Sequence, residues 1–207
     1  MRDAIAVMRD AFGQLSHPGG GIIMPARTVM QVGDEKSSLL VMPAYLPGSS
    51  SLGVKVISYF PGNRLRGVDP IQGVVILLDS ETGDVLAILE ADYITALRTG
   101  AASGLATDLL ARDDAHTLCL IGAGVQGEQQ VEAVRAVRPI TTLRIYDHDP
   151  ARAEALAGRI DRNAHRYLEV RVTGSSAEAV RGACVVTTAT TSDTPVFDGS
   201  LLEPGAH

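Results

Sequence analysis

The chain has 207 residues, of which 45% are hydrophobic, so it can bury a sizeable core in one or two domains. Its formal net charge of −6, without a basic block, argues against a nucleic acid partner. The apolar runs are too short to cross a membrane, no signal peptide pattern opens the chain, and its two cysteines do not suggest a disulfide framework. We therefore expect a soluble, cytoplasmic protein.

The N-terminal part of the chain combines one helical pattern with several strand patterns. Apolar residues recur on one helical face over residues 4–15. Short β-like runs follow at residues 28–32, 38–42, 53–60, 73–79 and 85–90. The segment 79–84 is typical of a hairpin turn. These patterns predict a mostly antiparallel sheet that carries one helix.

A long helix is predicted over residues 92–111, and its middle is unusually small. Residues 100–104 read Gly-Ala-Ala-Ser-Gly. Each glycine costs a helix about 1 kcal/mol relative to alanine. We therefore expect that a close neighbour leaves no room for a larger side chain at these positions. The sequence leaves two explanations open. Either another backbone or a ligand approaches this segment, or the helix packs tightly on a sheet.

The pattern changes at Thr117, where strands and helices begin to alternate. Strands are predicted at residues 117–121, 142–146, 168–172 and 184–189, and helices at residues 126–137, 150–160 and 176–181. This alternation with short connections predicts a parallel sheet with right-handed crossovers. We therefore predict an α/β protein with an N-terminal α+β domain over residues 1–112 and a Rossmann-type domain over residues 113–207.

A glycine-rich loop joins the first predicted parallel strand to its helix. Its glycines are Gly122, Gly124 and Gly127, in the spacing GxGxxG. In dinucleotide-binding proteins the first glycine permits a tight turn, the second lets the backbone approach a pyrophosphate, and the third lets the helix pack on the strand. The helix N-terminus offers free N–H groups to phosphates. The loop therefore predicts a dinucleotide site.

The next strand ends in Asp147, about twenty residues beyond the loop, where a carboxylate can accept hydrogen bonds from ribose hydroxyls. Such an acid favours NAD and repels the 2′-phosphate of NADP, although Arg144 and Arg152 nearby leave NADP open. Alternatively, Asp147 caps the following helix. Hydroxyl groups at residues 187–191 end the fourth strand and either face the cofactor or form a polar loop.

Three cations of the first hundred residues are candidates for binding a substrate. Arg27 follows a Met-Pro-Ala segment, Lys55 lies among apolar residues of an apparent interior strand, and Arg98 precedes the small-residue segment. A lysine among Val and Ile is costly to bury unless it is paired or hydrogen-bonded. Each of the three could equally be a surface charge.

Five motifs occur along the chain in an order that resembles a known family. They are the segments VMPAYL at residues 41–46, GVKV at 53–56, FPGN at 60–63, ALRTGAA at 96–102 and IGAGVQ at 121–126. Together they resemble the ornithine cyclodeaminase/μ-crystallin family over nearly the whole chain. The family includes ornithine cyclodeaminases, archaeal-type alanine dehydrogenases and ketimine reductases. The resemblance implies a homodimer whose N-terminal domain binds substrate and dimerises.

The resemblance also implies roles for individual residues. Arg27, Lys55 and Arg98 would surround the substrate carboxylate, and Lys55 would be the catalytic residue that orients a water or moves a proton. The residues implied to line the dinucleotide are Arg98, Thr99, Gly122, Gly124, Val125, Gln126, Gly127, Asp147 and Thr188. We predict no metal site.

The chain also departs from the family pattern. Ornithine-cyclising members carry a Glu where this chain has Leu40, which favours a smaller or apolar substrate. Family members exceed 300 residues, and the family's catalytic Asp would lie shortly after His207. The N-terminus also looks short by one strand. These departures predict a truncated cofactor domain, and a chain shortened in this way could lack activity.

The leading hypothesis is an NAD-dependent enzyme that transfers a hydride at the α-carbon of a small amino or imino acid. Ornithine cyclodeaminase, alanine dehydrogenase and ketimine reductase are the candidate types. A second hypothesis is a non-catalytic, μ-crystallin-like protein that binds NAD(P) or another ligand, because fold does not settle function. A third is a hydroxy-acid dehydrogenase, for which neither His17 nor His116 is well placed.

Overall fold

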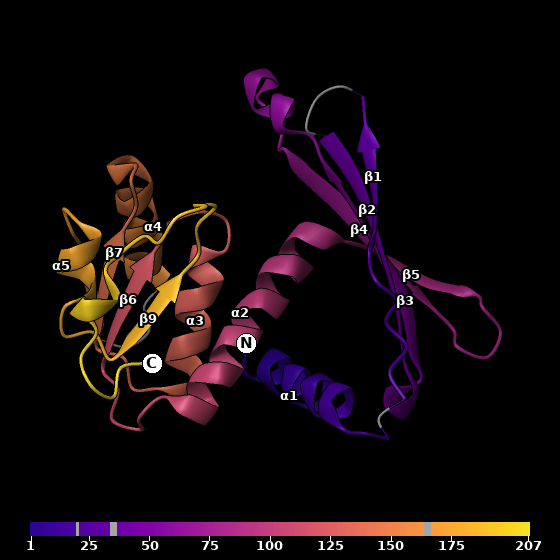
Figure 1. Ribbon diagram of the computed structural model, residues 1–207, viewed down its shortest axis with the longest axis horizontal. Helices are drawn as coiled ribbons and strands as arrows, with labels where there is room; N and C mark the ends of the chain where they lie inside the picture. Colours follow the sequence, from indigo (N-terminus) through magenta and orange to yellow (C-terminus); the bar gives the residue numbers. More distant parts are fainter. Residues whose placement is uncertain (20, 34–36, 164–166) are drawn as a thin grey trace. The chain divides into compact units, whose positions relative to one another are not determined.

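The computed structural model describes residues 1–19, 21–33, 37–163 and 167–207 (Figure 1). The chain divides into two compact units. The first unit contains Met1–Arg9 and Ala96–His207, and the second contains Asp10–Thr95. None of the helices in the described ranges is long and apolar enough to span a membrane. The domain boundary predicted near residue 112 stays a prediction.

The second unit is built on a five-stranded antiparallel sheet in the order β1-β2-β3-β4-β5. Its strands are β1 (Thr28–Val32), β2 (Ser37–Leu46), β3 (Ser51–Tyr59), β4 (Ile71–Leu78) and β5 (Val85–Glu90), with 3-10 turns at Pro47–Ser49 and Pro61–Arg66. The predicted hairpin forms between β4 and β5, where the amide of Asp79 donates to the carbonyl of Asp84 at 2.9 Å. The antiparallel sheet predicted from the alternating pattern is thus confirmed.

Strand β2 continues beyond the proline at which the sequence prediction ends it. Pro43 pairs with Val54 of β3, while β1 reaches no further along β2 than Val41. Farther along β2, on the side where β1 pairs, Tyr45 exchanges both backbone hydrogen bonds with Ile23. By the alternation of an antiparallel ladder, the missing N–H of Pro43 faces this side, between the two contacts. Proline is tolerated where no ladder bond is required.

The first unit contains a four-stranded parallel sheet in the order β8-β7-β6-β9, with helices beside it (Figure 1). The strands are β6 (Thr117–Ile121), β7 (Thr142–Tyr146), β8 (Glu169–Val172) and β9 (Val185–Thr188). The helices are α1 (Arg2–Ser16, which continues into the second unit), α2 (Ala91–Leu110, of which Ala96 onward lies in this unit), α3 (Gly127–Val137), α4 (Pro150–Asn163) and α5 (Ser176–Val180), with a 3-10 turn at Gly199–Leu201.

Both faces of strand β6 are buried. Leu118 and Leu120 pack in a core cluster with residues of α3 and α4, whereas Cys119 and Ile121 pack in a second cluster with residues of α5. This two-sided coverage explains the unbroken apolar run of β6, because strands of parallel sheets are buried on both faces. The predicted Rossmann-type parallel sheet, together with the α+β N-terminal region, is confirmed.

The small residues of α2 are explained by the close approach of another helix. A Cβ atom added at Gly100 would lie 2.6 Å from the carbonyl oxygen of Gln129 in α3. One added at Gly104 would lie 2.8 Å from Ile5 and 3.1 Å from Ala133. Of the two explanations left open by the sequence, a neighbouring backbone is therefore the correct one. It belongs to a helix rather than to a sheet.

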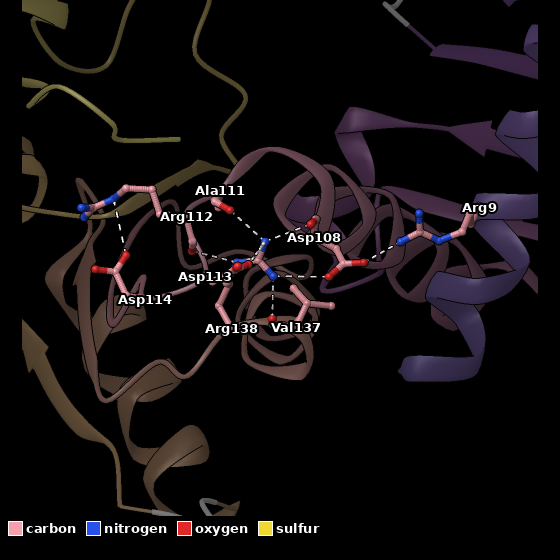
Figure 2. A network of polar contacts seen from close by, with 8 residues as sticks. All are labelled: Arg9, Asp108, Ala111, Arg112, Asp113, Asp114, Val137 and Arg138. Carbon is pink, nitrogen blue, oxygen red and sulfur yellow. Dashed lines mark hydrogen bonds and ion pairs between the residues drawn. The ribbon is translucent and has the colours of Figure 1, made fainter.

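A buried arginine closes the C-terminal ends of α2 and α3 (Figure 2). The side chain of Arg138 is 6% exposed. It donates to the backbone carbonyls of Asp108, Ala111, Arg112 and Val137 at 2.8–2.9 Å. The last carbonyls of a helix have no partner within it, so this guanidinium supplies donors to carbonyls at both helix ends, of which that of Arg112 also accepts the amide of Ala115 at 3.2 Å. Arg138 also contacts the Asp108 carboxylate at 3.3 Å, and that carboxylate pairs with Arg9 of α1.

Candidate functional site

Three chain segments with candidate cofactor residues meet at one edge of the parallel sheet. Ile121, the last residue of β6, is in register with Tyr146 of β7 and with Thr188 of β9. The glycine loop and Asp147 follow directly after Ile121 and Tyr146. They therefore lie side by side with Thr188 at the carboxyl ends of the strands. Ligands of open α/β sheets bind at such ends.

The first loop glycine occupies a backbone conformation that side chains rarely adopt. Gly122 has a φ of 102°, and its amide donates to the carbonyl of Tyr146 at 2.8 Å. A Cβ atom at this position would lie 2.4 Å from the carbonyl oxygen of Ala189. At Gly127, a Cβ atom would lie 3.0 Å from Leu156 and 3.1 Å from the carbonyl oxygen of Gly122. The turn and the helix therefore both need glycine for close packing.

Replacing Gly122 with alanine is expected to lower the free energy of unfolding by about 2 to 4 kcal/mol, through positive-φ strain and backbone overlap. Gly158→Ala is the matched control, since this glycine lies within α4 and has no atom within 4 Å of an added Cβ. That variant should gain about 0.5 to 1 kcal/mol from improved helix propensity. Urea unfolding measures both. Equal stability of the Gly122→Ala protein and the unaltered protein would show that this position does not require glycine.

Asp147 holds the glycine loop and its own turn in place. Its side chain is 6% exposed. One oxygen, Oδ2, accepts the amide of Ala123 at 2.7 Å, and the other, Oδ1, accepts the amide of Asp149 at 2.9 Å. Nδ1 of His148 lies 3.1 Å from Oδ1. The amide of Ala151 near the start of α4 is accepted by Asp149 instead, at 3.1 Å. The helix-capping alternative for Asp147 therefore applies to Asp149.

The loop residues fit a bound pyrophosphate. Within the described residues, the amides of Gly124, Val125 and Gln126 donate no hydrogen bond. Gly124 has open space where a Cβ would be, and the side chain of Val125 is 78% exposed. Free amides at the N-terminus of α3 favour an anionic group. These residues, together with Asp147, could hold the diphosphate and a ribose of a dinucleotide.

The remaining predicted cofactor residues differ in their surroundings. Thr188 ends β9 and is exposed at the same edge as the loop. Arg98 and Thr99 lie in α2, just before the glycine that contacts α3, and Arg98 is exposed. The first unit therefore brings the loop, Asp147 and Thr188 together at one edge of its sheet. Arg98 and Thr99 belong to a helix that packs on α3.

The other two candidate residues, Arg27 and Lys55, belong to the second unit. Lys55 lies in the middle of β3, and its Nζ donates to Oγ1 of Thr95 at 2.7 Å. Arg27 immediately precedes β1, whose first residue pairs with Val41, so Arg27 comes level with Met42, the partner of Lys55. If the register of β1 is continued by this one residue, two strand spacings, or about 10 Å, separate the backbones of Arg27 and Lys55. This separation suits two cations that share one small anion.

Sequence reasoning missed Thr95 as the hydrogen-bond partner of Lys55. It also does not single out Asp92, which lies one helical turn before Thr95 in α2. One signal is present in the composition. Lys36 and Lys55 are the two lysines among 18 basic residues, so a lysine retained in an interior strand is conspicuous. No local pattern, however, links β3 to the start of α2.

Neither thiol chemistry nor a metal centre is indicated by the described residues. Burial raises the pKa of Cys119 to about 12, so this thiol stays protonated. Both cysteines are free and buried. Among the residues that the structure describes, no group of three or more His, Cys, Asp and Glu side chains could hold a metal ion.

The parallel sheet, the glycine loop after β6 and the buried acid after β7 together define a Rossmann-type fold. The family model described as "Ornithine cyclodeaminase/mu-crystallin family" matches residues 1–207. The chain belongs to this family, as the sequence motifs predicted.

Curated relatives with similar sequences include reductases of imino acids. A Delta(1)-pyrroline-2-carboxylate reductase of Bacillus cereus is 40% identical over 185 residues, which are 89% of this chain and 56% of the relative. The ketimine reductase mu-crystallin of Mus musculus is 35% identical over 190 residues, which are 92% of this chain and 59% of the relative. The chain thus spans less than two thirds of the length of these relatives.

Solved structures of the same family have closely similar folds. The Delta(1)-pyrroline-2-carboxylate reductase of Thermococcus litoralis, in complex with NADH and L-proline, has a TM-score of 0.91 at 36% identity; the match covers 100% of this chain and 62% of that chain. An archaeal alanine dehydrogenase dimer with bound NAD has a TM-score of 0.89 at 32% identity, over 100% of this chain and 61% of that chain.

Proposed function

We propose that this protein is an NAD-dependent reductase of small cyclic imino acids that carry a carboxylate on the imine carbon. A relative at 40% identity is named as a Delta(1)-pyrroline-2-carboxylate reductase, one at 35% identity as a ketimine reductase, and a similar structure is described with NADH and L-proline. The observation that carries the proposal is the pairing of the Ala123 amide with the Asp147 carboxylate at 2.7 Å. This bond joins the two dinucleotide-binding segments into one preformed site.

The first unit is proposed to hold the dinucleotide. The amides following Gly122 bind the diphosphate, and Asp147 accepts hydrogen bonds from the adenosine ribose. The other proposed cofactor residues are Arg98, Thr99, Gly124, Val125, Gln126, Gly127 and Thr188. When bound as NADH, the nicotinamide supplies the hydride. Because Asp147 is negatively charged, NADH should bind better than NADPH, whose 2′-phosphate it repels.

The second unit is proposed to contribute the residues that bind the substrate. Arg27 and Lys55 neutralise the carboxylate, and Lys55 supplies the proton that the imine nitrogen needs. Leu40 and its β3 partner Ile57 stand on the same face of the sheet as Lys55. An apolar surface beside Lys55 suits a hydrocarbon ring. It offers no partner for the distal amine of ornithine, which argues against the cyclodeaminase type.

A homodimer is part of the proposal. Met30, Val74 and Ile88 share the sheet face opposite to Lys55, and these residues are 53%, 37% and 66% exposed. An apolar face of this kind is typical of an interface between subunits. The similar alanine dehydrogenase structure is described as a dimer. The mass in solution should therefore be that of two chains.

An absorbance assay at 340 nm tests the function. The purified protein is mixed with NADH and five- or six-membered cyclic imino acids, with pyruvate plus ammonia, and separately with NAD and L-ornithine. Oxidation of NADH by the cyclic imino acids is expected, with much slower reaction in the other two mixtures and with NADPH. Tight NADH binding without turnover of any imino acid would contradict the proposal and favour a non-catalytic binding protein.

A further inference from the structure

The environment of Lys55 includes the first turn of α2. Nζ of Lys55 donates to Oγ1 of Thr95 at 2.7 Å, and this hydroxyl donates to the carbonyl of Ala91 at 2.5 Å. Residues three apart on a helix lie on the same side of it, so Asp92 stands beside Thr95. The hydrogen bond between Lys55 and Thr95 therefore orients the lysine toward the side of α2 that carries Asp92.

The carboxylate of Asp92 has an oxygen without a hydrogen-bond partner. Oδ1 of Asp92 is shielded from solvent and forms no hydrogen bond with any residue that the structure describes. The neighbouring acid, Glu90, has a different task. Its two carboxylate oxygens accept the amides of Asp92 and Tyr93, at 2.8 and 3.2 Å, and so cap α2. Asp92 is thus the acid of this turn whose negative charge is not used in capping.

The charges around Asp92 come from three other elements. Burial raises the pKa of Asp92, and the negative charges of Glu90 at the end of β5 and Asp69 in the loop before β4, with a side-chain interaction with Glu90, raise it further. The positive charge of Lys55 in β3 acts in the opposite direction and lowers the pKa. This effect is the smallest of those named, and it agrees with the Lys55–Thr95 hydrogen bond, which brings the ammonium to the turn of α2 that carries Asp92.

We propose that Asp92 is a positioning residue that keeps Lys55 in its charged, proton-carrying form. This inference rests on the proposed function, in which Lys55 supplies a proton to the imine nitrogen. During reduction the hydride adds to the imine carbon, the π-electron pair moves to nitrogen, and nitrogen takes a proton from Lys55. Lys55 is then a neutral amine and regains its proton from water. The negative charge of Asp92 favours this return.

The direction of the effect follows from the reciprocity of coupling. If Lys55 stabilises the Asp92 carboxylate, the carboxylate stabilises the Lys55 ammonium by an equal free energy. Removing the charge in Asp92→Asn should therefore lower the pKa of Lys55 by about 1, because the pair is half-buried rather than fully buried. The high-pH limb of the rate profile should move to lower pH by the same amount.

The small number of lysines permits a direct measurement. Reductive ¹³C-methylation keeps the charge of amino groups and labels Lys36 and Lys55, the two lysines of this sequence, for titration by NMR. The Lys55 signal is assigned with Lys36→Arg. In Asp92→Asn the midpoint of the Lys55 signal should fall. Asp92→Glu should restore the original midpoint. Asp10→Asn, the same charge change at an exposed residue, should leave it unaltered.

An unchanged Lys55 midpoint in folded Asp92→Asn protein would overturn the inference. Should that variant not fold, the same coupling can be measured as the change in the pKa of Asp92 in the variant Lys55→Met. In that variant the ¹³C carboxyl signal of Asp92 should titrate at higher pH, and no change would equally overturn the inference. Both titrations are independent of turnover. A shifted midpoint in a protein that reduces no imino acid would therefore refute the proposed function and leave the coupling intact.

Discussion

Replacing Arg138 with methionine is expected to lower the free energy of unfolding by about 3 to 5 kcal/mol. The guanidinium is almost fully buried and donates to four backbone carbonyls at the ends of α2 and α3 (Figure 2). Methionine has a similar volume but no donor. The carbonyls of Asp108 and Ala111 would lose this donor, whereas that of Arg112 would keep the amide of Ala115 at 3.2 Å. Each buried polar group left unpaired is costly. Urea unfolding followed by circular dichroism measures the loss.

Arg159→Met is the matched control for this prediction. Arg159 lies in α4 and pairs with Glu128 at 3.2 Å, but its side chain is 44% exposed. Exposed ion pairs contribute about 0 to 1 kcal/mol, so this variant should lose less than 1 kcal/mol. If the two variants lost equal stability, the capping role of Arg138 would be wrong.

Replacing Lys55 with methionine is expected to lower kcat/KM for the cyclic imino acid by about 10³-fold or more. Two contributions are lost, namely the proton supplied to nitrogen, which is worth about 10² to 10⁴, and the positive charge near the carboxylate. The affinity for NADH should stay within about twofold, because the proposed dinucleotide residues all belong to the first unit, whereas Lys55 belongs to β3 of the second unit. Steady-state kinetics and a fluorescence titration with NADH separate the two effects.

The control is Arg64→Met, which removes an exposed cation of the same unit. Its kinetics should equal those of the unaltered protein. A Lys55→Met protein that turns over normally would remove Lys55 from the mechanism. One that no longer binds NADH would show that Lys55 has been assigned to the wrong half of the site.

Much of the fold could be predicted from sequence because its signals are local. Strands β1, β5, β6 and β7 have the predicted bounds, since period-two alternation or a short apolar run is visible within a few residues. The glycine loop lies between strand and helix as predicted, for the same reason. Helix α2 begins and ends within one residue of its predicted bounds despite its two glycines.

Local signals failed where distant residues decide the outcome. In the sequence, Pro43 indicates the end of a strand. The structure tolerates it because β1 does not pair with β2 at this position, and the sequence does not show which side of β2 lacks a partner. Arg138 resembles any charged residue after a helix, and its carbonyl partners in α2 and just beyond lie 26 to 30 residues earlier in the chain. No sequence pattern singles out Asp92, because Lys55 is 37 residues before it, in another element.

By itself the sequence determined the two kinds of sheet, the glycine loop, the acid after the second parallel strand and the family, because periodicity, turn chemistry and motif spacing are properties of neighbouring residues. The tertiary structure decided what these residues contact. It showed that Asp147 accepts the amide of Ala123 and that α2 needs glycines to pack on α3. It also showed that Thr95 accepts a hydrogen bond from Lys55. Burial and charge pairing depend on distances in space, and these arise when strands far apart in the chain come into register.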